Sequence, residues 1–79
     1  MKAYILMSTN VGKMWDAAEQ ALEIEGVKMA NAVTGFFDVI AYVEFTDMDM
    51  LGKIIDAIQS IKGVRKTQTA IVMTPRIKE

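Results

Sequence analysis

The chain has 79 residues, nine basic and ten acidic side chains, a net charge of −1, and neither histidine nor cysteine. The length predicts one domain over residues 1–79, with a frayed tail at 75–79. Without cysteine and histidine the chain can form no disulfide and no histidine-based nucleophile. It also lacks the usual ligands of zinc and copper, so we expect no metal and no cofactor. The balanced charge argues against direct nucleic-acid binding, and no apolar run suits a signal peptide or a membrane span. We therefore expect a cytoplasmic protein without a membrane partner.

The first half of the chain shows a strand pattern, a helix pattern and a second strand pattern. Residues 2–8 are typical of a strand, and Thr9 and Asn10 offer side chains that can cap a following helix. Apolar residues then recur at helical spacing at positions 11, 14, 15, 18 and 22, which predicts a helix that buries Trp15. Residues 27–34 favour a second strand.

The second half repeats the strand and helix patterns in a similar order. Residues 35–38 predict a turn, and residues 39–45 predict a third strand. Thr46 and Asp49 fit a capping box for a second helix, and residues 66–73 favour the last strand. The buried stripe expected for this second helix contains Met48, Leu51, Ile54, Ile55, Ile58 and Ile61.

An internal repeat predicts the architecture. The string Ile24-Glu25-Gly26-Val27-Lys28 returns 37 positions later as Ile61-Lys62-Gly63-Val64-Arg65. Each copy lies between a helix pattern and a strand pattern, which indicates two β-α-β halves. We predict an α+β, ferredoxin-like βαββαβ fold, because right-handed crossovers place both helices on one face of a four-stranded antiparallel sheet ordered 4-1-3-2.

The helix-free face of this sheet is unusually apolar. Side chains alternate between the two faces of a strand, and an antiparallel sheet normally shows polar residues to water. A contiguous apolar surface of this size usually marks an interface, so we predict a homodimer joined through sheet faces into an α/β barrel-like assembly. The residues expected at this interface are Tyr4, Leu6, Ala30, Ala32, Ile40, Tyr42, Ala70 and Val72.

The element order, the two Gly-Val-basic junctions and the string at residues 32–40 resemble one known family. They are similar to the effector-binding RAM domain of the Lrp/AsnC, or feast/famine, transcriptional regulators, and the likeness covers about residues 2 to 73. Three further segments match the family, namely residues 2–7, Gly12-Lys13 and Thr67-Gln68-Thr69. The most diagnostic piece is Thr-Gly-x-x-Asp at residues 34–38. Family members usually carry a helix-turn-helix domain before this one. Since the sequence shows no such domain before residue 2, we expect a stand-alone form here.

The resemblance implies a non-catalytic effector-binding and oligomerisation module that senses an amino acid between dimers. It also implies dimers that assemble into octamers, and full-length Lrp/AsnC regulators as partners. From the residues alone, Gly35 suits a tight turn whose N–H groups can receive a carboxylate. Asp38 could pair with an α-ammonium group or merely cap the turn, and both interpretations stay open. The ligand contacts implied by the resemblance are Thr34, Gly35, Phe36, Phe37, Asp38, Thr67 and Thr69.

Two other classes of function share this fold. An ACT-type amino-acid sensor would bind its effector at the loop over residues 8–12. A cofactor-independent dimeric enzyme would use Trp15, Asp38 and Tyr42 around a pocket inside each subunit. The chain offers no acid/base pair for the second alternative, so we expect no enzyme.

Overall fold

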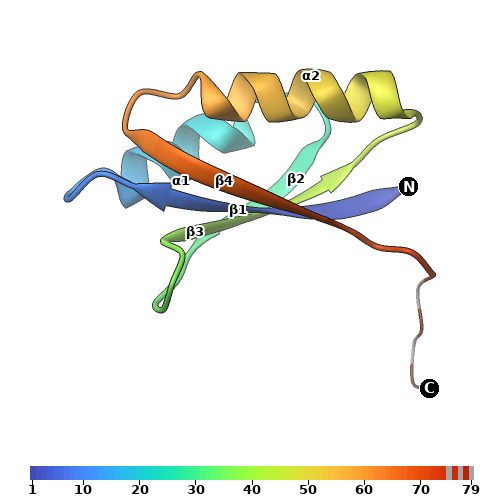
Figure 1. The fold of residues 1–79 in the computed structure, drawn as a ribbon, viewed down its shortest axis with the longest axis horizontal. Coiled ribbons are helices and arrows are strands. Elements are labelled where there is room, and N and C mark those ends of the chain that lie inside the picture. Colours follow the sequence, from blue (N-terminus) through green and yellow to red (C-terminus); the bar gives the residue numbers. More distant parts are fainter. Residues whose placement is uncertain (75, 77, 79) are drawn as a thin grey trace.

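The computed structural model describes residues 1–74, 76 and 78, and has the predicted βαββαβ order (Figure 1). Four strands form one antiparallel sheet in the order β2-β3-β1-β4, which is the predicted order read from the other edge. Both helices lie over the same face of this sheet (Figure 1). The tail predicted for residues 75–79 rests on Pro75, Ile77 and Glu79, which lie outside the described residues. The elements are β1 (Lys2–Thr9), α1 (Met14–Leu22), β2 (Val27–Ala32), β3 (Val39–Glu44), α2 (Met48–Gln59) and β4 (Val64–Ile71).

The two halves of the sequence repeat adopt the same local structure. Gly26 and Gly63 both have positive φ, +98° and +97°, which only glycine adopts without strain. The carbonyl of Gly26 accepts a hydrogen bond from the Glu44 N–H, and that of Gly63 accepts one from the Asn10 N–H, each at 2.8 Å. Each junction therefore fastens the segment after a helix to the end of a neighbouring strand, which confirms the two-halved architecture.

The core lies between the sheet and the helices. The predicted alternation of side chains between the two faces of β1 and β3 is confirmed, because every second residue of these two strands is buried against the helices. Helix α2 contributes large branched side chains, whereas α1 contributes alanines that let its backbone lie close to the sheet. The buried residues of these four elements include Ala3, Ile5, Met7, Val39, Ala41, Val43, Leu51, Ile54, Ile58, Ala17, Ala18 and Ala21.

Helix α1 differs from the prediction in its start and in its buried face. It begins at Met14, and its N-cap residue Lys13 makes no capping hydrogen bond through its side chain. Thr9 belongs to β1 instead of capping a helix. Val11 precedes the helix and is fully exposed, and Trp15 is 68% exposed, so the predicted burial of Trp15 is wrong. The spacing of apolar residues was compatible with two helix faces, and the alanine face packs on the sheet.

The start of α2 also differs from the prediction. Asp47, not Thr46, is the N-cap residue, and its Oδ1 accepts a hydrogen bond from the Met50 N–H at 2.8 Å. Asp47 has the extended backbone that an N-cap needs, so its side chain reaches the first turn. Met48 is 60% exposed and lies outside the buried stripe. Leu51 and the buried isoleucines of that stripe were predicted correctly.

The expected positions of Ala30 and Ala32 on the helix-free face are wrong. Val27 pairs with Val43, but Met29 already pairs with Tyr42, so β2 holds one extra residue at this point. Such a bulge reverses the faces of all later residues in the strand. Ala30 and Ala32 consequently lie on the helix-covered face, and Ala30 packs against the core.

No helix in the described part of the chain is long and apolar enough to cross a membrane. Likewise, residues 1–74, 76 and 78 include no group of three or more His, Cys, Asp or Glu side chains that could hold a metal ion.

Three glycine substitutions test the packing described above. A Cβ at Gly26 would lie 2.8 Å from Ile54 Cδ1 and 3.0 Å from the Glu44 carbonyl oxygen, so Gly26→Ala should lower the free energy of unfolding by about 1–3 kcal/mol. Gly52 lies within α2 with open space around it, so Gly52→Ala should raise it by about 1 kcal/mol. Urea titration measures both. Gly12 also has a positive φ, but an added Cβ there would meet nothing within 4 Å. The free energy of unfolding of Gly12→Ala should therefore lie between those of the other two variants.

Candidate functional site

The turn over residues 34–38 is fastened to two strands. The Val33 N–H donates to the Asp38 carbonyl at 2.8 Å, which closes the turn between β2 and β3. The Asp38 N–H donates to the Met7 carbonyl at 2.8 Å, which ties the turn to β1. Gly35 has φ +124°, and a Cβ there would meet nothing within 4 Å. Glycine is therefore needed at position 35 for backbone conformation and not for space.

The Asp38 carboxylate already has a structural partner. Its Oδ2 accepts hydrogen bonds from the Thr9 N–H at 2.8 Å and from Thr9 Oγ1 at 3.3 Å. Thr9 is only 8% exposed, so this carboxylate oxygen satisfies a nearly buried backbone donor. Asp38 Oδ1 accepts no hydrogen bond from the described residues. One carboxylate oxygen therefore positions the turn, and the other has no hydrogen-bond donor among the described residues.

Sequence reasoning missed the role of Thr9. The residue was interpreted as a helix cap, because a short polar side chain before a helical pattern is the usual signal for one. No local pattern relates Thr9 to a carboxylate that lies 29 positions further along the chain. Only the pairing of β1 with β3, which brings Met7 opposite Val39, reveals the contact.

The remaining predicted ligand contacts differ in exposure and position. Thr34 and Phe36 are exposed, Phe36 completely, whereas Phe37 is half-buried. Thr67 and Thr69 lie in β4, where they pair with Met7 and Ile5 of β1 and face the helices. Thr67 Oγ1 accepts a hydrogen bond from Gln59 Nε2 of α2 at 3.0 Å.

Within one chain, strand β1 separates the two parts of the predicted ligand site. Strand β1 lies between β3, which follows the turn, and β4, which carries the two threonines. The turn and the start of β4 are nevertheless at the same end of the sheet, because Met7 pairs with both Val39 and Thr67.

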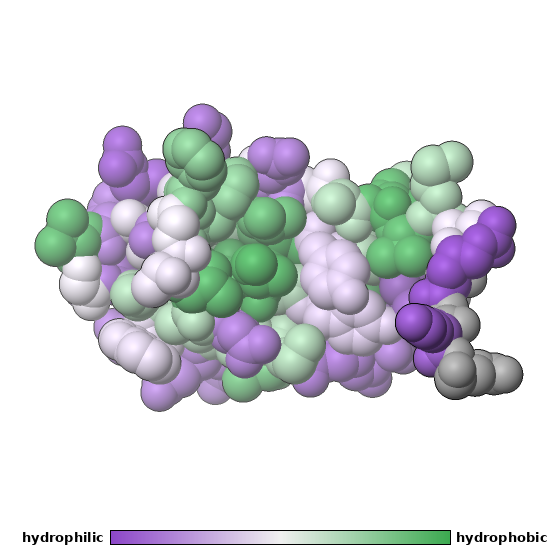
Figure 2. Space-filling model, turned by 90° about the horizontal axis from the view of Figure 1, so that it is seen from below, coloured by the Kyte–Doolittle hydropathy of each residue, from purple (hydrophilic) through white to green (hydrophobic). Residues whose placement is uncertain are grey.

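The helix-free face of the sheet carries the second predicted surface. Figure 2 shows hydrophobic residues gathered along the middle of this face, with hydrophilic residues toward its edges. The rings of Tyr4 and Tyr42 lie side by side there, with centroids 5.3 Å apart and planes at 49°. The register places on this face six of the eight predicted interface residues, together with Met29. The six are Tyr4, Leu6, Ile40, Tyr42, Ala70 and Val72.

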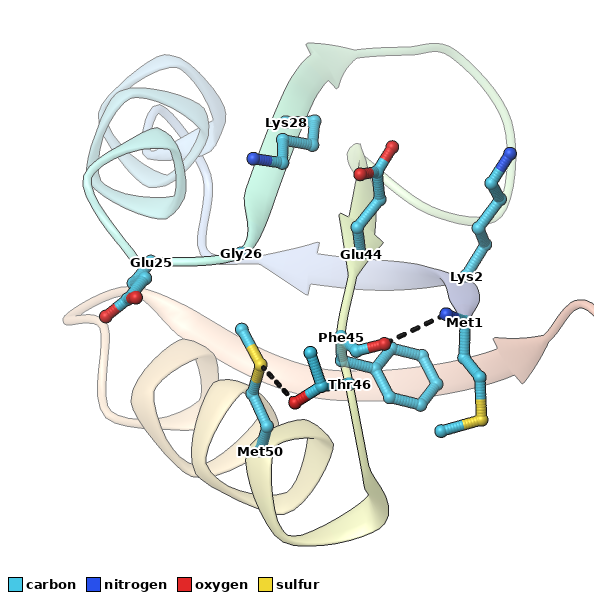
Figure 3. A pocket seen from close by; sticks show the side chains of 9 residues that line it. All are labelled: Met1, Lys2, Glu25, Gly26, Lys28, Glu44, Phe45, Thr46 and Met50. Atoms are coloured by element: carbon cyan, nitrogen blue, oxygen red, sulfur yellow. Dashed lines mark hydrogen bonds between the residues drawn. The ribbon is translucent and has the colours of Figure 1, made fainter.

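A hollow that sequence reasoning did not predict lies at the opposite end of the sheet (Figure 3). It has a volume of about 350 Å³. The terminal amine of Met1 donates to the Phe45 carbonyl at 2.9 Å beside it, and Thr46 Oγ1 donates to Met50 Sδ at 3.7 Å (Figure 3). None of the predicted ligand contacts lines it. The lining residues are Met1, Lys2, Glu25, Gly26, Lys28, Glu44, Phe45, Thr46 and Met50.

The three residues of the enzyme alternative do not share a pocket. Trp15 lies on the surface beside β2, and Tyr42 lies on the opposite, helix-free face of the sheet. Asp38 lies in the turn. The space between sheet and helices, where such an enzyme would hold its substrate, is filled by the buried apolar side chains of the core.

The sequence as a whole matches the family model of the Lrp/AsnC ligand binding domain over residues 2–79. The HTH-type transcriptional regulator FL11 of Pyrococcus abyssi is 30% identical over 73 residues, which cover 92% of this chain and 48% of the regulator. The chain is also similar to homocitrate synthase of Sulfolobus acidocaldarius, at 36% identity over 50 residues. That match covers 63% of this chain and 11% of the synthase. The chain thus spans about half the length of the regulator and about a tenth of that of the synthase.

Solved structures agree with the family match. TTHA0845 from Thermus thermophilus superimposes with a TM-score of 0.84 at 28% identity, covering 95% of this chain and 98% of that one. The transcriptional regulator NMB0573 from Neisseria meningitidis, solved as an L-Met complex, superimposes with a TM-score of 0.79 at 29% identity. That superposition covers 99% of this chain and 52% of the regulator. The chain belongs to the Lrp/AsnC ligand-binding domain family, whose domains are effector-binding regulatory modules.

The hydrogen bonds between Asp38 and Thr9 predict a stability effect. Asp38→Ala should lower the free energy of unfolding by about 1–3 kcal/mol, because the nearly buried Thr9 N–H loses its acceptor. Asp56→Ala removes the same charge from an exposed position on α2 and should change stability little. Equal stability of the two variants in urea titration would contradict the structural role of Asp38.

Proposed function

We propose that the chain is a non-catalytic amino-acid-binding and oligomerisation module of a transcription-regulatory system. The observation that carries the proposal is the turn over residues 34–38. It is held by the hydrogen bonds of Asp38, while residues 34–36 are exposed and Asp38 Oδ1 accepts no hydrogen bond from the described residues. A carboxylate oxygen beside exposed N–H groups complements the ammonium and carboxylate groups of an amino acid. The complex of NMB0573 with L-Met supports an amino acid as the ligand class.

The proposed dimer forms through the helix-free face. Tyr4, Met29 and Tyr42 present aromatic and thioether surface there, and Leu6 and Ile40 lie beside them. At ~25 cal/mol per Å², burial of roughly 400 Å² of apolar surface per subunit would contribute on the order of 10 kcal/mol before the costs of association. A surface of this kind stabilises a dimer when it is covered and is costly when it is left in water.

Assembly beyond the dimer would complete the ligand site. The turn and the pair Thr67 and Thr69 lie on opposite sides of β1, so one chain offers each half separately. We propose that they meet across a contact between dimers, in an octamer or in joint assemblies with full-length Lrp/AsnC regulators in the cytoplasm. An amino acid bound between dimers would shift this assembly, because it binds the assembled state more tightly than the separate dimers.

Charge placed on the helix-free face should abolish the proposed dimer. Leu6→Asp puts a carboxylate opposite Ile40 in the middle of that face, where burial of an unpaired charge is costly. Light scattering should report a monomer for this variant and a dimer or larger species for the parent. Met48→Asp introduces the same group at an exposed apolar position on α2 and should leave the mass unchanged. A dimeric Leu6→Asp variant would contradict the sheet-face interface.

A second pair of variants tests the ligand site and the ACT-type alternative. Asp38→Asn keeps an oxygen that can accept from the Thr9 N–H but removes the charge that would pair with an α-ammonium group. Calorimetry against the 20 amino acids should show loss of binding, by at least tenfold in Kd, with the fold retained. Asn10→Ala should bind as the parent does, because only the Asn10 backbone contacts Gly63. The opposite pattern would favour the ACT-type site, and a parent that binds no amino acid would overturn the proposal.

A further inference from the structure

An apolar hollow lies beside the proposed ligand turn. It is formed where the first residues of α1 meet the end of β2, and it has a volume of about 470 Å³. None of its lining side chains carries a charge. The lining residues are Met14, Trp15, Ala32, Val33 and Thr34.

Trp15 is not required by the core of the domain. The face of α1 that packs on the sheet consists of Ala17, Ala18 and Ala21, and all three are buried. Trp15 lines the hollow instead and is 68% exposed. A tryptophan left at a surface in this way loses the free energy that its burial would provide, and such residues dominate binding at sites that are covered by a ligand or a partner.

The hollow is continuous with the turn that holds Asp38. Val33 lines the hollow, and its N–H donates to the Asp38 carbonyl at 2.8 Å. Thr34 lines the hollow and is also the first residue of the turn. Figure 1 shows this turn at the same end of the sheet as the start of α1. The uncharged lining of the hollow therefore extends to the first residue of the turn that ends at Asp38.

We propose that this hollow is the side-chain subsite of the ligand site and selects amino acids with large apolar side chains. This inference rests on the proposed function, and it adds the class of effector. The side chain lies against the Trp15 indole and Val33, and the uncharged lining disfavours lysine, arginine, aspartate and glutamate, whose charges would lose water without gaining a partner. Glycine and alanine leave the hollow unfilled. Each missing methylene in such a subsite weakens binding by roughly tenfold or more.

The only tryptophan of the chain is a direct reporter of this subsite. Titration with L-leucine or L-methionine should shift Trp15 fluorescence to shorter wavelength in a saturable way, because the indole leaves water. L-lysine, L-glutamate and glycine should give no saturable shift, and calorimetry should show Kd values at least about tenfold weaker for them. Trp15→Ala should weaken L-leucine binding by at least about tenfold, whereas Trp15→Phe, which keeps a ring, should retain most of it. Met48→Ala shortens a similarly exposed apolar side chain on α2 and should bind as the parent does.

The outcomes separate this inference from the proposed function. If the parent binds amino acids but Trp15→Ala leaves their affinities and order unchanged, the subsite is wrong and the ligand turn survives. A preference for charged amino acids would also overturn the subsite alone. If no amino acid binds, the proposed function fails and the subsite fails with it. If the fluorescence shifts with protein concentration and not with L-leucine, a second copy of the chain covers the hollow and the inference is overturned.

Discussion

Two short helices can cover only one face of a four-stranded sheet, and in this protein the uncovered face is apolar. Helices α1 and α2 lie over the same side, where β1 and β3 bury every second residue completely. The alternate residues of the same strands, including Tyr4, Leu6, Ile40 and Tyr42, point to the bare side. The fold alone leaves this surface in water. The proposed dimer follows from the need to cover it.

Strand β1 links the turn over residues 34–38, the start of β4 and the helix-free face. One side of it holds the proposed ligand turn, through Thr9 and Met7, and the other side pairs with the start of β4. Its own side chains reach both the core and the helix-free face. A ligand that contacts the turn therefore acts on an element that is central to the sheet. In the proposed function, this arrangement connects ligand binding to assembly without any catalytic group.

Much of the fold could be predicted from the sequence, because two strong signals agree. The Gly-Val-basic repeat predicted two equivalent halves, and the glycines of both copies have nearly the same φ. Alternation in β1 and β3 identified the buried face of each strand correctly. The same argument predicted the wrong faces in β2, because one extra residue between Val27 and Met29 reverses the faces of Ala30 and Ala32. Sequence periodicity contains no signal for such a bulge.

The candidate site was less accessible to sequence reasoning. The turn and its residues could be singled out from resemblance, but the partner of Asp38 could not, because Thr9 lies far away in the chain. Trp15 was expected in the core, since a large apolar residue at helical spacing normally packs there. The alanines of α1 provide the packing surface instead, and this leaves Trp15 beside the turn.

Sedimentation equilibrium of the unmodified protein, over a wide range of concentrations, tests the central claim most directly. We expect a dimer or a multiple of it, which persists on dilution as an apolar interface requires. A stable monomer at the highest concentrations, with its tyrosine-bearing sheet face open to water, would contradict it.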